Sequence, residues 1–213
     1  MADNYLESKF EELRNGGVKK QTSKKIHFLE SLLTKNRSYR GYDKNVVVGH
    51  STLEKIVYVN TKIPSAKNQQ VLRFKLVTRD NGAEKVLENI KLGGMLPELH
   101  LPYQGTEPEA FIIVCTSAPE TKIIDIDLGI SMQSMLLKAT EMGLNGIIIC
   151  AFNKAKITEA FNLPYEPLAI VAIGKGAEKI KLVSIDESES RAYYRDENGV
   201  HYVPKVKAEQ LIL

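Results

Sequence analysis

Two short segments of this 213-residue chain carry side chains that could bind a ligand. Segment 36–43 (NRSYRGYD) places Arg37, Ser38 and Arg40 close together after an apolar stretch typical of a helix. Guanidinium groups bind phosphate through paired, charge-assisted hydrogen bonds, so this segment indicates a phosphate site. Segment 64–70 (PSAKNQQ) is a turn rich in small residues and amides, which could contact the edge of a planar heterocycle.

Together the two segments predict a site for flavin mononucleotide (FMN), which has both a phosphate and a planar ring. Other features of the sequence do not indicate a reaction. Segment 174–176 (GKG) lacks the spacing of a nucleotide-binding fingerprint, and the four histidines show no metal-ligand spacing, so no metal site is predicted. Cys115 and Cys150 adjoin apolar runs and are both predicted to be small buried hydrophobic residues.

The composition excludes several classes of protein. Lys and Arg number 29 against 26 Asp and Glu, a formal charge of +3, which gives no indication of nucleic-acid binding. No apolar run approaches the roughly 18 residues of a membrane-spanning helix. The first residues lack a basic head followed by an apolar stretch. These observations predict a cytoplasmic protein with no membrane partner.

Hydrophobic periodicity predicts a mixture of helices and strands. Helices are expected at 6–13, 26–35, 51–60 and 127–142, with Gly143 as the stop of the last one. Asp125 and Asp127 are predicted to cap that long helix. Strands are expected at 71–77, 111–115, 168–173 and 181–183, followed by a hairpin around Asn198-Gly199. This mixture indicates an α+β fold.

The order of these motifs resembles the nitroreductase family of flavoproteins over residues 26–210. Segment 36–42 stands where members carry Arg-Arg-Ser-x-Arg-x-Phe, and segment 64–72 matches Pro-Ser-Ser-x-Asn-x-Gln-Pro-Trp in outline. Gly143-Leu144-Asn145, a strand ending at Gly174 and the late pair Lys205 and Lys207 complete the order. Two departures are visible, because Asn36 replaces the first arginine and Val71-Leu72 replaces Pro-Trp.

The resemblance implies roles for particular residues. Arg37, Ser38, Lys205 and Lys207 would bind the flavin phosphate, and Arg40 would face the N1/O2 side of the ring or the ribityl chain. Pro64, Ser65, Asn68 and Gln70 would reach the flavin from the neighbouring subunit. A backbone N–H of Cys150 or Ala151 would face flavin N5, and no side chain is implied to be catalytic. The alternative, Cys150 as a nucleophile, requires a neighbouring base or cation that the sequence does not show.

The resemblance also implies a fold and an activity. Residues 1–213 would form a single nitroreductase-like domain, a three-layer sandwich with a mainly antiparallel central sheet flanked by helices. Residues 1–25 would be an N-terminal helical extension, and 175–213 a C-terminal extension toward the partner of a homodimer with shared FMN sites. The chain would pass hydride from NADH or NADPH through flavin N5 to a nitroaromatic, quinone or similar small molecule by a ping-pong mechanism.

Two alternatives stay open: a different flavin reaction on the same fold, and a degenerate flavin-binding or regulatory module. The second is motivated by Asn36 and by Val71-Leu72. The choice between NADH and NADPH, and the identity of the electron acceptor, also stay open.

Overall fold

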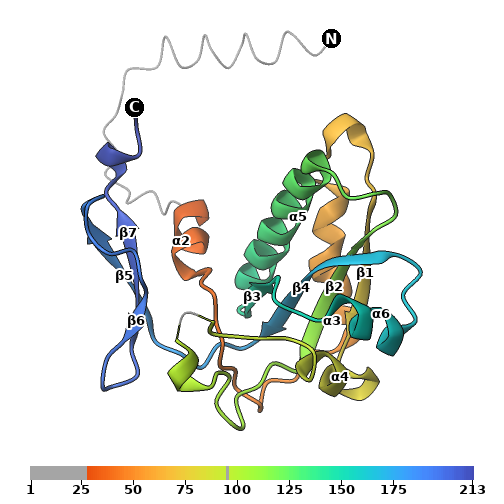
Figure 1. Cartoon of the computed structure of the whole chain (residues 1–213), viewed down its shortest axis with the longest axis horizontal. Helices are drawn as coiled ribbons and strands as arrows, with labels where there is room; N and C mark the ends of the chain where they lie inside the picture. The colour runs from red at the N-terminus through yellow and green to blue at the C-terminus, as the bar shows by residue number, and fades with distance from the viewer. Residues whose placement is uncertain (1–27, 95) are drawn as a thin grey trace, which may run out of the picture. The chain divides into compact units, whose positions relative to one another are not determined.

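The computed structural model of the chain describes residues 28–94 and 96–213 (Figure 1). The chain divides into two compact units, Met1–Ser31 and Leu32–Leu213. The predicted helix at 6–13 and the predicted extension at 1–25 lie outside the described residues. From the predicted helix at 26–35, residues Phe28–Lys35 form helix α2.

The centre of the second unit is an antiparallel four-stranded sheet with the order β1-β2-β4-β3. Its strands are β1 (Leu72–Val77), β2 (Ala110–Thr116), β3 (Asn145–Ile149) and β4 (Glu166–Gly174). The strands predicted at 71–77, 111–115 and 168–173 are therefore confirmed. β2 and β4 are the two inner strands, which explains why their sequences are unbroken apolar runs.

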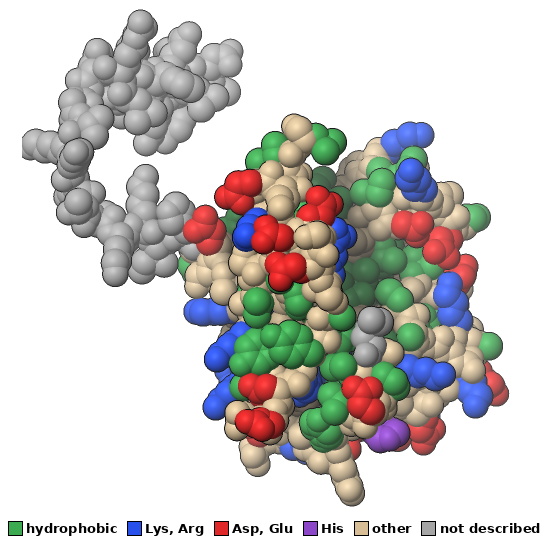
Figure 2. Space-filling model, turned by 60° about the vertical axis from the view of Figure 1, so that its left-hand side comes forward, with side chains coloured by type: hydrophobic (Ala, Val, Ile, Leu, Met, Phe, Trp, Pro, Cys, Tyr) green, Lys and Arg blue, Asp and Glu red, His purple; other side chains and the backbone are tan. Residues whose placement is uncertain are grey.

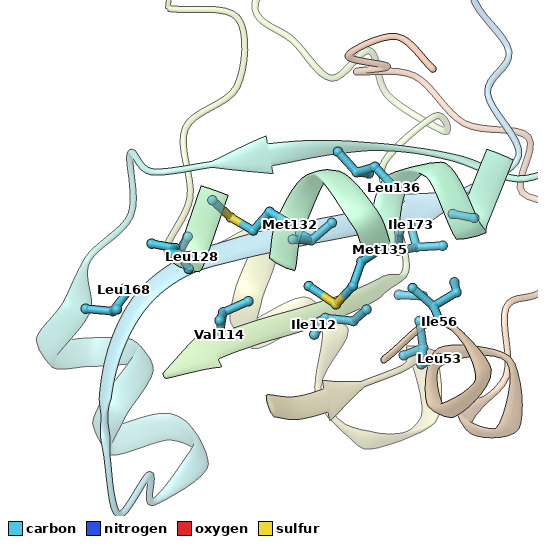
Figure 3. Packing of buried hydrophobic residues seen from close by; sticks show 14 of the residues in the cluster. Leu53, Ile56, Ile112, Val114, Leu128, Met132, Met135, Leu136, Leu168 and Ile173 are labelled. Carbon is cyan, nitrogen blue, oxygen red and sulfur yellow. The ribbon is translucent and has the colours of Figure 1, made fainter. Parts of the chain in front are cut away.

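Helices cover both faces of this sheet, because successive residues of a strand point to opposite sides. On one face Ile112 and Val114 of β2 pack with α3 (His50–Val57) and α5 (Lys122–Glu141), as Figure 3 shows. On the other face Phe111 and Ile113 pack with α4 (Ala83–Leu87) and α6 (Lys154–Phe161). The predicted α+β three-layer sandwich is confirmed.

The long helix α5 begins five residues earlier than the sequence predicts. Thr121 is its N-cap, and the Thr121 side chain accepts a hydrogen bond from the Ile124 N–H at 3.4 Å. Asp125 and Asp127 lie inside the helix, so the prediction that they cap it is wrong. At the other end Gly143 adopts a φ of 78° and stops the helix, as predicted.

The C-terminal residues form a second, three-stranded sheet with the order β5-β7-β6. β5 (Ile180–Ile185) pairs in parallel with β7 (His201–Val206), and β6 (Tyr194–Arg195) pairs antiparallel with β7. The predicted hairpin is confirmed, because the Asp196 carboxylate accepts hydrogen bonds from the Asn198 and Val200 N–H groups at the turn. The 3₁₀ turns are η1 (Tyr58–Thr61), η2 (Ala66–Asn68), η3 (Arg79–Asn81), η4 (Pro97–Leu99) and η5 (Ala208–Gln210).

The two cysteines lie in different environments. Cys115 on β2 is buried, as predicted, and burial raises the pKa of its thiol to about 11. Cys150 is exposed, so the prediction that it is buried is wrong. The reason is that β3 ends at Ile149, and Cys150 follows the strand outside the sheet.

Among the residues that the structure describes, no helix is both long and apolar enough to cross a membrane.

Candidate functional site

A cavity of about 310 Å³ lies between segment 36–40, the middle of α5, β3 and the C-terminal sheet. We call it the arginine pocket. It brings together four of the residues predicted to bind FMN, and these are Arg37, Ser38, Arg40 and Lys205. Gln133, Leu136, Ile148, Tyr193, His201 and Val203 are also part of its lining. Ligand pockets in proteins have volumes of about this size.

Backbone hydrogen bonds fix the arginine-bearing segment against the sheet. Ser38 forms a bridge with Gly146 at the start of β3, and the Tyr39 N–H donates to the Gly146 carbonyl at 3.2 Å. Farther along, the Tyr42 N–H donates to the Thr106 carbonyl at 2.9 Å. Gly174 and Gly176 permit this close packing, because a Cβ at these positions would lie 2.6 Å from the Tyr42 ring and 2.2 Å from the Tyr39 ring. Segment 38–42 is therefore held in one place beside the start of β3.

The arginines of the pocket keep hydrogen-bonding capacity for a ligand. The Nε atoms of Arg37 and Arg40 are buried, and neither has a hydrogen-bond partner within the described part of the chain. Burial lowers the pKa of Arg37 below its ordinary value, although an arginine stays protonated at neutral pH. Buried donors without partners are costly, so these atoms indicate a site built for an anion.

Neighbouring residues orient Arg40. Its guanidinium lies 4.9 Å from the centroid of the Tyr193 ring and donates to the Ser38 carbonyl at 3.1 Å. Behind the pocket Glu178 accepts hydrogen bonds from the backbone N–H groups of Arg40 and Gly41, and it forms an ion pair with Arg195. The Glu178 carboxylate is thus occupied and does not line the pocket. The residues of the lining are polar, apolar or cationic, and they suit a phosphate.

Lys207 does not line the arginine pocket, although Lys205 does. The Lys207 ammonium pairs with the Asp186 carboxylate at 2.8 Å. Side chains two residues apart in a strand share a face, but β7 ends at Val206. Lys207 therefore lies outside the strand and need not share the face of Lys205. The assignment of Lys207 to a flavin phosphate stays a prediction without geometric support in this pocket.

The predicted turn at 64–70 lines a different cavity, of about 480 Å³, which we call the loop pocket. Pro64, Ser65 and Gln70 line it together with residues of β1, α3 and α5. The turn is tight, with positive φ at Lys67 (53°), Asn68 (52°) and Gln70 (48°). The Gln70 side-chain amide donates to the Asn68 side-chain oxygen at 2.8 Å, so these two amides contact each other.

Asp127 of α5 holds the turn in place. The buried Asp127 carboxylate accepts a hydrogen bond from the Ser65 hydroxyl at 2.7 Å and from the Ala66 N–H at 2.9 Å. The sequence did not predict this role, because Asp127 was expected at the start of the helix as a capping residue. The spacing of Asp127 from Ile124, Leu128 and Met135 in an apolar helix pattern was the signal that its side chain is buried.

We expect Asp127→Ala to destabilise the protein by about 1.5–3 kcal/mol, because it removes two hydrogen bonds to a charged acceptor and leaves their donors without partners. Urea unfolding measures this change. Asp125→Ala is the matched control, since Asp125 is exposed on the same turn of α5, and we expect it to change stability by less than about 0.5 kcal/mol. Equal losses in the two variants would contradict the role of Asp127.

The two pockets lie on opposite sides of α5. Asp127 faces the loop pocket and Leu136 faces the arginine pocket, and nine residues correspond to about two and a half helical turns. One chain therefore does not bring segment 64–70 together with segment 36–40 in a common cavity.

Cys150 and Ala151 follow β3, the strand that begins beside Ser38 and contributes Ile148 to the arginine pocket. Both residues are exposed. The Ala151 carbonyl accepts a hydrogen bond from the Lys91 N–H at 2.9 Å, which fixes the backbone after the strand. In the part of the chain that the structure describes, the N–H groups of Cys150 and Ala151 enter no turn or loop hydrogen bond.

Tyr193 and His201 are pocket residues that the sequence reading did not assign. His201, Val203 and Lys205 lie on one face of β7, because side chains two residues apart share a face. Once Lys205 is placed at the site, this period predicts His201 there as well. Tyr193 precedes β6, and no sequence pattern indicated its position.

A model of the nitroreductase family matches residues 33–175. A solved nitroreductase family protein from Clostridium difficile 630 is similar, with 26% identity, a TM-score of 0.59, and coverage of 85% of this chain and 95% of that one. A nitroreductase-fold protein from Exiguobacterium sibiricum 255-15, solved in complex with FMN, shares 21% identity and a TM-score of 0.57 over 70% of this chain and 88% of that one. A protein from Staphylococcus epidermidis ATCC 12228 assigned as an NAD(P)H:FMN oxidoreductase shares 21% identity and a TM-score of 0.57 over 74% and 91%. A search of curated proteins gave no match.

The fold is thus an α+β three-layer sandwich with a cationic pocket beside β3. The matched residues span most of the chain, and the chain belongs to the nitroreductase family.

Proposed function

We propose that this chain binds FMN and works as an oxidoreductase that transfers hydride from NADH or NADPH to a small-molecule acceptor. The observation that carries the proposal is the arginine pocket, where the buried Nε atoms of Arg37 and Arg40 have no hydrogen-bond partner among the described residues. Membership of the nitroreductase family supports it, and so does the FMN bound to the similar Exiguobacterium protein.

In this proposal the pocket residues bind the phosphate. At neutral pH a phosphate monoester carries about 1.5 to 2 negative charges. Arg37, Arg40 and Lys205 offset that charge, and the Ser38 hydroxyl adds a hydrogen-bond donor. This gives Arg40 a different role from the ring or ribityl contact that the resemblance implies, because it lines the same pocket as the other three residues. Bound FMN would supply N5 as the atom that accepts and returns hydride. The exposed backbone after β3, at Cys150 and Ala151, follows the same strand that lines the pocket and would present an N–H group to the ring.

We also propose that the active form is a homodimer in which each flavin contacts both subunits. The separation of the loop pocket from the arginine pocket on opposite sides of α5 supports this, because segment 64–70 would then serve the flavin of the partner. The C-terminal extension, 175–213, would lie toward that partner.

An apolar stripe on α5 provides a surface for the homodimer. The stripe consists of Ile123, Ile126, Ile130 and Leu137, with Ile123 and Ile126 exposed and the other two half-buried. Their spacings of three, four and seven residues match the seam of a pair of packed helices. Separately, Figure 2 shows a hollow on one face of the molecule, with hydrophobic side chains inside it. Exposed apolar surface of this kind indicates an interface.

The visible spectrum of the purified protein tests the proposed function. We expect a yellow protein with flavin absorbance that bleaches when NADH or NADPH is added without oxygen and returns when a quinone or nitroaromatic is added. Flavin that binds but is not reduced by either nucleotide would contradict the oxidoreductase and favour a flavin-binding module. A protein that binds no added FMN would contradict the proposal altogether.

Cys150→Ala should retain bound FMN and near wild-type flavin reduction, because the proposed contact with N5 uses backbone and the N–H is unchanged. The thiol is exposed, and in the described structure it has no hydrogen bond or ion pair that would activate it. Stopped-flow reduction by NADPH, followed by reoxidation with a quinone, measures both half-reactions. Normal reduction with abolished reoxidation would instead assign the thiol a chemical role.

A further inference from the structure

His201 is a buried histidine in the lining of the arginine pocket. It lies at the start of β7 with 2% of its surface exposed, on the same strand face as Lys205. Its Nδ1 atom is buried and has no hydrogen-bond partner among the residues the structure describes. A buried ring nitrogen without a partner is uncommon in a folded protein, and it indicates a missing ligand or a missing proton acceptor.

Charged and aromatic groups surround the imidazole from every neighbouring element. The centroids of the Tyr193 and His201 rings lie 5.1 Å apart, and the Arg40 guanidinium lies over the Tyr193 ring. The charged groups nearby are Arg37 and Arg40 on segment 36–40, Glu178 before β5, Arg195 on β6 and Lys205 on β7. The negative charge of Glu178 is already paired with Arg195.

These surroundings keep the imidazole neutral when the pocket contains no anion. Burial, and then the positive charges of Arg40 and Arg195, lower the pKa of His201 to about 4, while Glu178 raises it by less. An anion placed among Arg37, Arg40 and Lys205 would reverse the balance of charge that the imidazole experiences. It would also supply an acceptor for a ring N–H, which would favour the protonated imidazole.

The geometry points to His201 as a phosphate-binding residue that takes up a proton from solvent when FMN enters the arginine pocket. The inference rests on the proposed function, since FMN supplies the phosphate. In the bound state the imidazolium would donate a hydrogen bond to a phosphate oxygen, and the proton would return to solvent when the ligand leaves. The buried Nδ1 would then have a role in the loaded protein.

The sign of the pH dependence follows from the two states. Because the complex holds a proton that the free protein releases near pH 4, affinity should rise as the pH falls from 8 to 6. The phosphate itself gains a proton near pH 6, which acts in the opposite direction. Protonation of the phosphate contributes equally in the wild type and in a variant that cannot titrate at position 201. The difference in pH dependence between the two proteins therefore reports His201 alone.

Calorimetric titration of the apoprotein with FMN, in two buffers of different ionisation enthalpy, measures this proton uptake. We expect greater uptake for the wild type than for His201→Gln at pH 6.5. We also expect His201→Gln to lose roughly ten- to a hundredfold in affinity at pH 6 and less than about tenfold at pH 8. His50→Gln is the matched control, since His50 is exposed on α3 outside the pocket, and it should behave as the wild type. Riboflavin, which has no phosphate, should show no uptake that depends on His201.

Tight FMN binding with equal proton uptake in the wild type and in His201→Gln would overturn the inference. If the variant does not fold, NMR titration of the His201 ring in the wild type replaces it, with and without ligand. There an unchanged ring pKa would overturn the inference, and a raised one would support it. If FMN does not bind at all, the proposed function fails, and inorganic phosphate becomes the probe in the same NMR experiment. A raised His201 pKa with phosphate would then support an anion site of another function, and no change would reject His201 as well.

Discussion

Replacing Arg37 with alanine should lower FMN affinity by roughly ten- to a hundredfold, the effect of removing a charge-assisted hydrogen bond. Arg37 lines the arginine pocket, and its buried Nε has no partner in the described structure. This N–H group is therefore free to donate a hydrogen bond to a bound phosphate. Fluorescence titration of the apoprotein measures the change. The affinity for riboflavin should stay within a few-fold, because riboflavin lacks the phosphate.

Two further variants sharpen this prediction. Lys205→Ala should also weaken FMN binding, whereas Lys207→Ala should have a much smaller effect, because Lys207 pairs with Asp186 outside the pocket. Arg191→Ala is the matched arginine control, since Arg191 is exposed and pairs with Glu187. Unchanged affinity in both Arg37→Ala and Lys205→Ala would remove the phosphate assignment. A large loss in Lys207→Ala would restore the family-based assignment of that residue.

If the proposed homodimer forms through the α5 stripe, Ile126→Glu should convert it to monomer and release the flavin with it. Ile126 is 55% exposed in the subunit, so the substitution should leave the fold of each subunit intact. In a two-fold symmetric interface the variant would place two new carboxylates in an apolar seam, each costing several kcal/mol. Such a cost corresponds to a loss of more than about a thousandfold in dimer affinity.

Sedimentation velocity, recorded at the flavin and protein wavelengths, measures both parts of this prediction. Val47→Glu is the matched control, because Val47 is also exposed but does not belong to the α5 stripe. A wild-type monomer that carries flavin would contradict the shared site. An Ile126→Glu dimer with normal flavin content would place the interface elsewhere.

The fold was more predictable from the sequence than the site. The unbroken apolar runs of β2 and β4 identify inner strands, because burial on both faces removes the polar alternation. The start of α5 was misplaced because its first turns carry Asp125 and Asp127, which look like capping residues. The apolar spacing around Asp127 signals its burial, but only the packed structure shows that its carboxylate accepts a hydrogen bond from a residue 61 positions earlier in the chain.

Within the site, local motifs predicted Arg37, Ser38 and Arg40, because all three lie in one short segment. Residues that depend on where a strand ends were harder. Lys205 and Lys207 look equivalent in the sequence, yet the end of β7 separates them. Cys150 looked buried because three isoleucines precede it, although β3 ends before it. Tertiary contacts decide these cases, and periodicity alone does not report them.

The anchoring of segment 38–42 through Gly146 has a consequence for ligand selection. The guanidinium groups are gathered by folding, because the Tyr39 N–H donates to the Gly146 carbonyl and because Gly174 and Gly176 leave room for the Tyr42 and Tyr39 rings. The electrostatic repulsion among the cations is thus overcome before any ligand arrives, and binding need not organise them. Such pre-organisation raises affinity by lowering the entropic cost of association. It also keeps the pocket in one shape, so that the size and charge of the anion, and not the motion of a closing loop, decide which molecules bind.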